Sequence, residues 1–116
     1  MTSNAAVALP DPLDRTLTAL ADPARRRVVE LLRERPRRAG ELADALSMSP
    51  SVMSRHLKVL RDSEVVEEAS PGFDARVRIY SLRSGATAAL RSWLDAVEQG
   101  WAEQLAALKA HVEGGG

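Results

Sequence analysis

Apolar residues recur every three or four positions in four short segments of the chain, which is the spacing of one helix face. These segments cover approximately residues 11–20, 24–35, 39–46 and 49–62. Asp11-Pro12 and Asp22-Pro23 mark the first two starts, because Asp caps a helix and Pro fits its first position. The pattern therefore predicts four helices, and we expect residues 1–10 before them to form a disordered arm.

Only Ser47-Met48-Ser49 separates the third and fourth of these helices. Ser49 followed by Pro50 is a strong start signal for the fourth helix. On that helix Met53, Leu57 and Leu60 fall at i, i+4 and i+7, which predicts a buried stripe. The opposite face is polar and partly cationic, with Ser51, Ser54, Arg55, Lys58 and Asp62. Two short helices in this arrangement are typical of a helix-turn-helix.

Two short alternating runs follow, Val65–Ala69 and Arg76–Leu82. They flank Pro71-Gly72-Phe73-Asp74, so the pattern predicts a β-hairpin with its turn at these four residues. Arg76 and Arg78 share one face of the second strand.

A last helix is predicted from a cap at Ser84 to about Val112. Its apolar residues are spaced 4, 3, 4, 4, 3 and 4 positions apart, so they form a nearly straight stripe that needs a partner. The predicted fold is mainly α with a small β-hairpin: a winged helix-turn-helix domain over residues 11–113, followed by a flexible tail at 114–116. We expect its terminal helices to form a homodimer interface through Leu13, Leu17, Leu20, Leu90, Leu94, Val97, Trp101 and Leu105.

Composition excludes several classes of protein and of binding site. A chain of 116 residues is one domain. It has no cysteine, which excludes disulfides and thiolate metal sites. With two histidines and no glycine-rich phosphate loop, nothing suggests an enzyme or a cofactor. No apolar run approaches a membrane span and the amino end lacks a signal pattern, so we expect a soluble cytoplasmic protein.

The formal net charge is zero, but the charge is unevenly distributed. Residues 23–83 hold thirteen Lys and Arg against nine Asp and Glu, a net of +4, whereas the two flanks hold three against seven, a net of −4. Because attraction of a polyanion depends on the local field, the basic middle of the chain favours nucleic acid as a partner.

Three stretches resemble the ArsR family of bacterial winged-helix repressors. They are LADPARRRVVELL (20–32), GELADALSMSPSVMSRHLKVLRDSEVV (40–66) and RVRIYSL (76–82), within a resemblance that spans about residues 11–112. Residues 54–60, SRHLKVL, are the most specific part. The resemblance implies a homodimer that binds operator DNA in adjacent major grooves, with repression relieved by a ligand or a metal.

The metal sites of that family cannot be assembled here. Its metal sensors place cysteines on the helix before the turn, where this chain has residues 41–46, ELADAL, or a carboxylate and two histidines on the last helix. Here Asp95 is followed two residues later by Val97, and His111 stands alone. The last helix resembles instead the metal-independent branch, in which a Trp-containing helix ends the chain.

We expect a set of mainly polar residues on the fourth helix and the hairpin to contact double-stranded DNA. Arg55 is the best candidate for a bidentate contact to guanine. The predicted set is Ser49, Ser51, Val52, Ser54, Arg55, His56, Lys58, Arg76 and Arg78.

Four members or neighbours of this set have a second interpretation. His56 lies at the edge of the buried stripe, so it either meets a phosphate or is a half-buried structural residue. Arg76 and Arg78 either contact DNA or pair with Glu67 and Glu68 across the hairpin. Arg38 stands where a capping box would have Ser or Thr, and it either reaches a phosphate or is an unoptimised surface residue.

The sequence therefore predicts a DNA-binding transcriptional repressor. Two copies of the fourth helix would meet an inverted repeat whose half-sites lie about one duplex turn, ~34 Å, apart. The alternative is a winged helix that docks protein without specific DNA binding. We call the polar face of the fourth helix the recognition face. If Glu64, Glu67 and Glu68 neutralised the positive charge of this face, that would favour the alternative.

Overall fold

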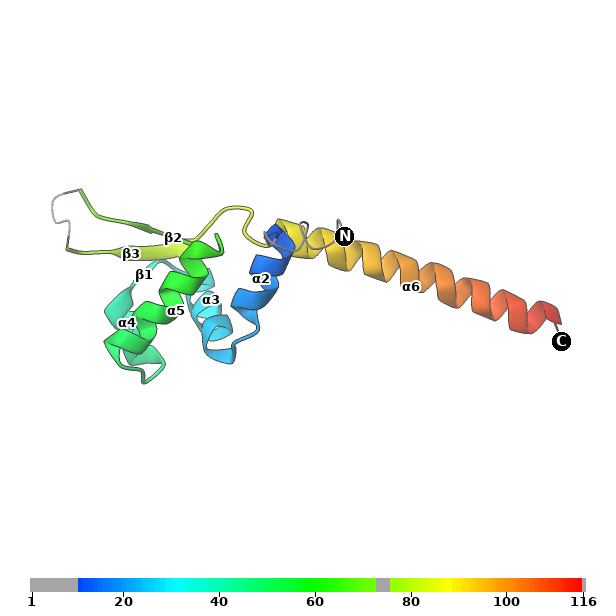
Figure 1. Ribbon diagram of the computed structural model, residues 1–116, viewed down its shortest axis with the longest axis horizontal. Helices are drawn as coiled ribbons and strands as arrows, with labels where there is room; N and C mark the ends of the chain where they lie inside the picture. The colour runs from blue at the N-terminus through cyan, green and yellow to red at the C-terminus, as the bar shows by residue number, and fades with distance from the viewer. Residues whose placement is uncertain (1–10, 73–75, 116) are drawn as a thin grey trace, which may run out of the picture.

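The computed structural model of the protein describes residues 11–72 and 76–115 (Figure 1). The expected arm at residues 1–10, and Phe73 and Asp74 of the expected turn, lie outside the described residues. The elements are α2 (Pro12–Leu20), α3 (Pro23–Glu34), β1 (Arg37–Arg38), α4 (Ala39–Ala45), α5 (Pro50–Asp62), β2 (Val66–Ala69), β3 (Ile79–Leu82) and α6 (Ala88–Gly115). The predicted order of helices and hairpin strands is confirmed, with one additional strand.

Both Asp-Pro starts form as predicted. Asp11 accepts a hydrogen bond from the Asp14 backbone N–H at 2.8 Å at the start of α2. Asp22 accepts from the backbone N–H groups of Ala24 at 2.7 Å and Arg25 at 3.2 Å at the start of α3. These carboxylates satisfy N–H groups that have no partner within the helix.

One hydrophobic core joins α3, α4, α5 and the sheet. Its largest fully buried side chains are Leu42, Met53, Leu57, Leu60, Val28, Val65 and Val66. The predicted stripe of α5 is thus confirmed, with Met53 and Leu60 at 0 % exposure and Leu57 at 2 %. Leu31 and Leu46 are half-buried against the same core.

The face of α2 that packs inward is not its leucine face. Thr16 and Ala19 are buried, and Thr16 donates its hydroxyl proton to the Pro12 carbonyl at 2.9 Å. Leu13 and Leu20 stay half-buried, and Leu17 is 41 % exposed. The protomer therefore leaves the leucines of α2 available for another contact.

The sheet has three antiparallel strands in the order β1-β3-β2. β2 pairs with β3 from Val66 opposite Leu82 to Ala69 opposite Ile79, which confirms the hairpin. The second strand is shorter than predicted: β3 begins at Ile79, so Arg76 and Arg78 precede the strand rather than share one of its faces. β1 was not predicted: Arg37 lies opposite Tyr80 and Arg38 opposite Ile79. This two-residue strand ties the segment between α3 and α4 to the hairpin.

The last helix begins later and ends later than the sequence suggested. Ser84 does not cap it, because residues 84–87 form turns in which the Ala86 N–H donates to Arg83 and the Ala88 N–H donates to Gly85. Gly85 has φ +75°, a left-handed conformation that glycine adopts without strain. α6 then continues to Gly115, so residues 114 and 115 are helical rather than a flexible tail.

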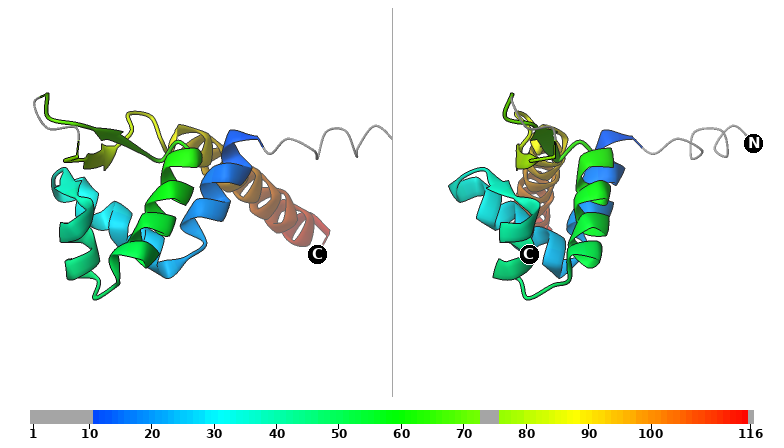
Figure 2. Two further views of the ribbon diagram at one scale, coloured as in Figure 1. Left: turned by 60° about the vertical axis from the view of Figure 1, so that its left-hand side comes forward. Right: turned by 90° about the vertical axis from the view of Figure 1, so that its left-hand side faces the viewer.

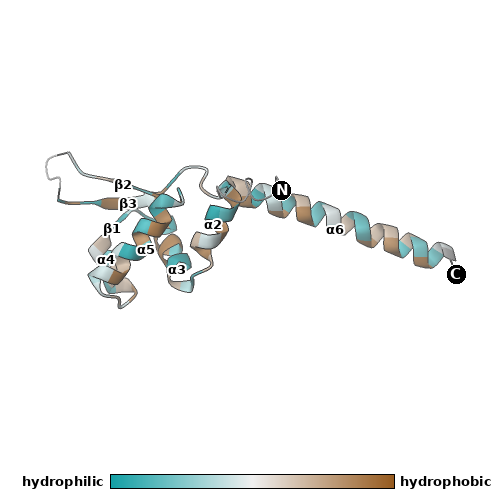
Figure 3. Cartoon of the chain, viewed as in Figure 1, coloured by the Kyte–Doolittle hydropathy of each residue, from teal (hydrophilic) through white to brown (hydrophobic). Residues whose placement is uncertain are grey.

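α6 projects far beyond the body of the protein (Figures 1 and 2). The protein measures 71 × 38 × 25 Å, and of the other helices α2 makes the main contact with α6, near its start. Apolar segments recur along the whole length of α6 (Figure 3). Among the described helices, none is long and apolar enough to cross a membrane.

Candidate nucleic-acid interface

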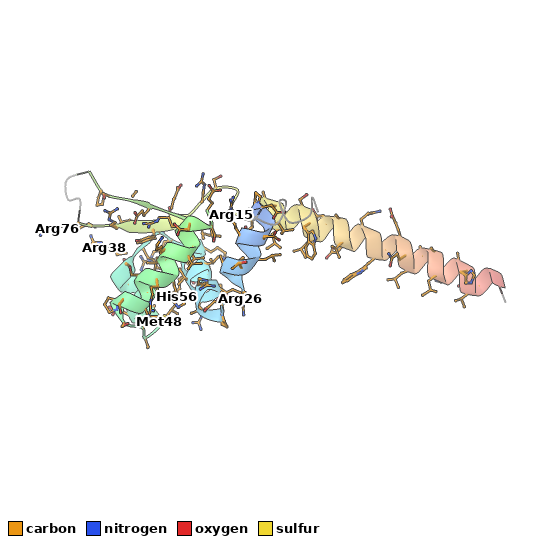
Figure 4. All side chains as sticks on the ribbon, in the orientation of Figure 1. Arg15, Arg26, Arg38, Met48, His56 and Arg76 are labelled. Atoms are coloured by element: carbon orange, nitrogen blue, oxygen red, sulfur yellow. The ribbon has the colours of Figure 1, made fainter. Side chains whose placement is uncertain are left out.

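The turn between α4 and α5 is closed by local backbone geometry. Ser47 has φ +54°, and the Met48 N–H donates to the Ala43 carbonyl at 2.9 Å. Ser49 then caps α5, because its Oγ accepts from the Val52 N–H at 3.2 Å. Met48 marks this turn in Figure 4. The predicted break and cap are both present, and they fix the direction in which α5 leaves the turn.

The outer face of α5 is exposed as the helical periodicity predicts. Ser51, Ser54, Arg55 and Lys58 are exposed, while Val52 is half-buried. The Arg55 side chain makes no hydrogen bond or ion pair with any part of the chain that the structure describes. Its guanidinium therefore offers all five donors outward.

Lys58 is held differently from Arg55. Its Nζ donates to Asp62 Oδ2 at 2.8 Å, one helical turn further along α5, with both side chains more than half exposed. The hydrogen bond from Lys58 lowers the pKa of the Asp62 carboxyl below its ordinary value. The recognition face thus contains one anion, which is paired with one of its cations.

His56 faces the protein interior rather than the outer side of α5. It is half-buried, with Nδ1 3.5 Å from a terminal nitrogen of Arg25 on α3 (Figure 4). Arg25 in turn donates to the Ala19 carbonyl at 2.6 Å and the Thr18 carbonyl at 3.1 Å, at the end of α2. The structure therefore supports the structural interpretation of His56, next to an arginine that binds the carboxyl end of α2.

Glu68 joins the end of α5 to the wing. Its Oε1 accepts from Arg61 at 2.8 Å and from Arg78 at 3.0 Å. Burial raises the pKa of the Glu68 carboxyl, but the Tyr80 hydroxyl and the two guanidiniums outweigh that effect and hold it below its ordinary value. The alternative predicted for Arg78, a pairing across the hairpin, is confirmed for Glu68. The sequence did not predict the contact of Arg61 with Glu68, because it joins two separate segments, the end of α5 and β2.

A groove of about 320 Å³ lies between the start of α4 and the wing. Arg38, Arg76 and Arg78 line it, together with Tyr80. Arg38 and Arg76 both lie at the wing end of the body in Figure 4. The Arg38 backbone N–H donates to Glu41 at 3.1 Å, which is half of a capping box, while the Arg38 side chain is exposed. The strand β1 thus places a third arginine beside the two that were predicted.

Two of the three acidic residues that would neutralise the recognition face pair with arginines other than Arg55. Glu64 lies 3.6 Å from Arg15 and 3.9 Å from Arg83, and Glu68 binds Arg61 and Arg78. Neither of them reaches Arg55. Within residues 11–72 and 76–115, no group of His, Asp or Glu side chains is arranged to hold a metal ion.

Comparison with known proteins places this geometry in a family. The model of the family described as "Bacterial regulatory protein, arsR family" matches residues 22–68, from the cap of α3 to β2. The chain is also 43 % identical over 82 residues to the HTH-type transcriptional regulator Rv2034 of Mycobacterium tuberculosis, covering 71 % of this chain and 74 % of that protein. The chain belongs to the ArsR family.

Two further proteins extend the comparison. The transcriptional repressor SdpR of Bacillus subtilis is 30 % identical over 60 residues, which cover 52 % of this chain and 67 % of SdpR. The homodimeric winged helix-turn-helix DNA-binding domain of Mb0332 from Mycobacterium bovis has a similar fold, with a TM-score of 0.62 at 23 % identity over 90 % of this chain and 92 % of that domain. The protein is accordingly an ArsR-family transcriptional regulator with a winged helix-turn-helix DNA-binding domain.

Proposed function

We propose that this ArsR-family protein is a homodimeric repressor that inserts the outer face of α5 into the major groove of an inverted-repeat operator. The observation behind the proposal is that Arg55 projects from this face without an internal partner, while Met53, Leu57 and Leu60 anchor the opposite face in the core. A helix fixed in this way fits the major groove, which is about 12 Å wide.

In the proposed complex Arg55 contacts a guanine and the other polar residues position the helix. Ser51, Ser54 and Lys58 lie within one turn of Arg55, so they would meet the adjacent phosphates and bases. Ser49 and Val52 lie at the amino end of α5, where the helix would enter the groove. His56 contributes through the orientation of Arg25 and α5 rather than by a direct contact.

The wing is proposed to contact the DNA beside the major-groove helix. Arg38, Arg76 and Arg78 line one groove at this end of the body and so provide cations for the backbone. Arg78 would exchange its bond to Glu68 for a phosphate, while Arg61 would retain Glu68 and hold the wing against α5.

Dimerisation is proposed to involve α2 and α6. Leu13, Leu17 and Leu20 on α2, and Leu90, Leu94, Val97, Trp101 and Leu105 on α6, all remain at least partly exposed in the single chain. Trp101 and Leu105 are 65 % and 66 % exposed, a large apolar surface for an isolated protomer. The homodimeric state of the Mb0332 domain supports a dimer, and the repressor function of SdpR supports the proposed role as a repressor.

Substitution of Arg55 tests the proposal on an operator selected from random duplexes. Arg55→Ala should weaken operator binding by about 30-fold or more, because the dimer loses one bidentate contact in each of two half-sites at roughly 1–3 kcal/mol each, and leave binding to random DNA within a few-fold. Fluorescence anisotropy measures both affinities, and Arg33→Ala, which removes an exposed cation from α3, is the matched control. Unchanged operator affinity in Arg55→Ala, or failure of selection to enrich any sequence, would overturn the proposal and favour protein docking.

A further inference from the structure

A cavity of about 240 Å³ lies where α2, the turn after α5 and the start of α6 meet. Its charged lining consists of Arg15 from α2, Glu64 from the turn and Arg83 from the connection after β3. Arg15 lies beside the start of α6 in Figure 4. All three residues lie outside the proposed DNA-binding set, so the proposed function gives this cavity no role.

The guanidinium groups in this cavity have unused hydrogen-bonding capacity. Arg15 Nε is buried and has no hydrogen-bond partner within the described part of the chain. Glu64 lies 3.6 Å from a terminal nitrogen of Arg15 and 3.9 Å from one of Arg83, and both distances exceed that of a hydrogen bond. Because a buried donor without a partner costs free energy, an acceptor from outside the protomer would bind favourably here.

The carboxylate of Glu64 indicates which kind of acceptor fits. Its Oε2 faces Arg15 and its Oε1 faces Arg83, so one carboxylate between the two guanidiniums meets both. The Glu64 side chain is 56 % exposed and can turn toward solvent. A carboxylate that takes its place could approach Arg15 to about 2.7–2.9 Å and accept from Nε and a terminal nitrogen together, the bidentate geometry that guanidinium favours.

We propose that this cavity binds a small molecule that carries a carboxylate on a short aliphatic chain. Arg15 and Arg83 hold the carboxylate, and Glu64 is the internal group that the ligand displaces. The site is contained in one protomer, so it binds its ligand with or without the proposed homodimer.

The rest of the lining determines the size and polarity of the ligand. The cavity is smaller than the roughly 300–1,000 Å³ of sites for drug-sized molecules, so it admits only a few carbon atoms. The hydroxyls of Ser63 and Ser84 offer hydrogen bonds to a polar substituent. Small apolar side chains line the remainder, namely Pro12, Ala86, Ala88 and Ala89.

The cavity lies away from the apolar faces proposed for dimerisation. Arg15 is two positions from both Leu13 and Leu17, so it lies on the opposite side of α2 from these leucines. Ala88 is two positions from Leu90 and likewise lies on the opposite side of α6. A ligand in the cavity therefore contacts α2, the end of α5 and the start of α6 together without entering the proposed dimer interface.

Titration with small carboxylates at constant ionic strength, followed by NMR of the full chain, tests the site. The probes are acetate, lactate, butyrate and valerate, with butyramide as the uncharged analogue of butyrate. We expect dissociation constants in the millimolar range, because ligands of this size make few contacts. Butyrate should shift the Arg15 Nε–H resonance and the backbone amides of Ser63 and Ser84, whereas butyramide should not.

Removal of one guanidinium distinguishes a specific site from general attraction to positive charge. Arg15→Gln should weaken butyrate binding about 10-fold or more, because it removes a charged hydrogen-bonding partner. Arg27→Gln is the matched control. Arg27 lies 3.7 Å from Glu30 on α3, a similar exposed pair that stands away from the residues lining the cavity. The control should leave the dissociation constant unchanged.

Substitution of Glu64 gives a result that a purely structural ion-pair cluster would not. Glu64→Gln removes the competing carboxylate and should tighten butyrate binding about 2- to 5-fold, the equivalent of one exposed ion pair. Glu64→Gly is a second variant in case the first does not fold, because residue 64 has φ +61°, which glycine adopts without strain. Glu30→Gln is the matched control and should leave binding unchanged.

The outcomes bear on this site separately from operator binding. Shifts at Arg15 Nε that weaken in Arg15→Gln and occur at lower butyrate concentration in the Glu64 variants support the site. It is overturned if none of the four carboxylates shifts these resonances, if butyramide acts like butyrate, or if the Glu64 variants bind butyrate more weakly. Inorganic phosphate that binds as tightly as butyrate would overturn the assignment to aliphatic carboxylates. None of these results changes the role proposed for Arg55.

Discussion

Asp62 is the anion on the proposed recognition face, and its neutralisation yields a quantitative prediction. Its Oδ2 lies 2.8 Å from Lys58 Nζ, in an ion pair whose side chains are 64 % and 58 % exposed. In the free protein Asp62 therefore compensates a cation that the proposed complex directs toward phosphate. Asp62→Asn removes this compensation without changing the shape of the side chain.

The size of the effect follows from counterion release. One additional net positive charge in each protomer of the proposed dimer should steepen the dependence of log K on log salt by up to about 1.8. If the two salt-dependence lines converge near 1 M salt, Asp62→Asn binds up to about 30-fold more tightly at ~0.15 M. We expect a gain between about 3-fold and this limit, because the flexible Lys58 side chain reaches phosphate only part of the time.

Fluorescence anisotropy on the selected operator, repeated across a series of salt concentrations, measures both quantities. Glu30→Gln is the matched control, since it removes an equivalent anion that pairs with Arg27 at 3.7 Å on α3. The control should leave the salt dependence unchanged. Equal slopes for Asp62→Asn and the unsubstituted protein would refute the placement of Lys58 and Asp62 at the DNA.

Three further predictions concern the elements that hold this face in place. Ser49→Ala removes the cap of α5 and should lower the free energy of unfolding by about 1 kcal/mol in urea denaturation, whereas Ser54→Ala, at an exposed position, should change it little. Leu57→Ala opens a cavity at a side chain that is 2 % exposed and should cost about 2–5 kcal/mol in the same assay; a loss below about 1 kcal/mol would contradict the anchoring role. Glu68 has a folded-state pKa below its ordinary value of 4.5, so its carboxylate stabilises the fold at neutral pH and this contribution disappears as the pH falls below about 4.5. The difference in unfolding free energy between the unsubstituted protein and Glu68→Gln should therefore shrink from pH 7 to pH 3, and a constant difference would contradict the assignment.

The sequence was sufficient to predict those parts of the structure that local signals determine. Asp11, Asp22 and Ser49 cap the helices that they were expected to start, because a cap involves only the next three residues. The spacing of Met53, Leu57 and Leu60 likewise identified the buried face of α5, and hence the exposure of Arg55 on the opposite face.

The features that the sequence missed depend on contacts between distant segments. β1 is two residues long and exists because Arg37 and Arg38 pair with Tyr80 and Ile79, more than 40 positions away. No periodicity is detectable in two residues. The contact of Arg61 with Glu68 likewise requires α5 and β2 to be assembled.

The start of α6 was predicted wrongly for a different reason. Serine is a residue type that often caps helices, which is why Ser84 was predicted to do so. The following Gly85 adopts φ +75°, however, and the chain makes a further turn before the helix begins at Ala88. Either course of the backbone was compatible with the local sequence. The contact between α2 and the start of α6 is part of the assembled fold, and a local pattern does not contain it.

Methylation interference on the selected operator tests the central claim most directly, because it reports which guanine N7 atoms the bound protein needs in the major groove. The account predicts interference at guanines in two symmetry-related tracts about one duplex turn apart, and loss of that interference at the Arg55 contact in Arg55→Ala. Interference confined to a single tract, or identical patterns for the unsubstituted protein and Arg55→Ala, would contradict it.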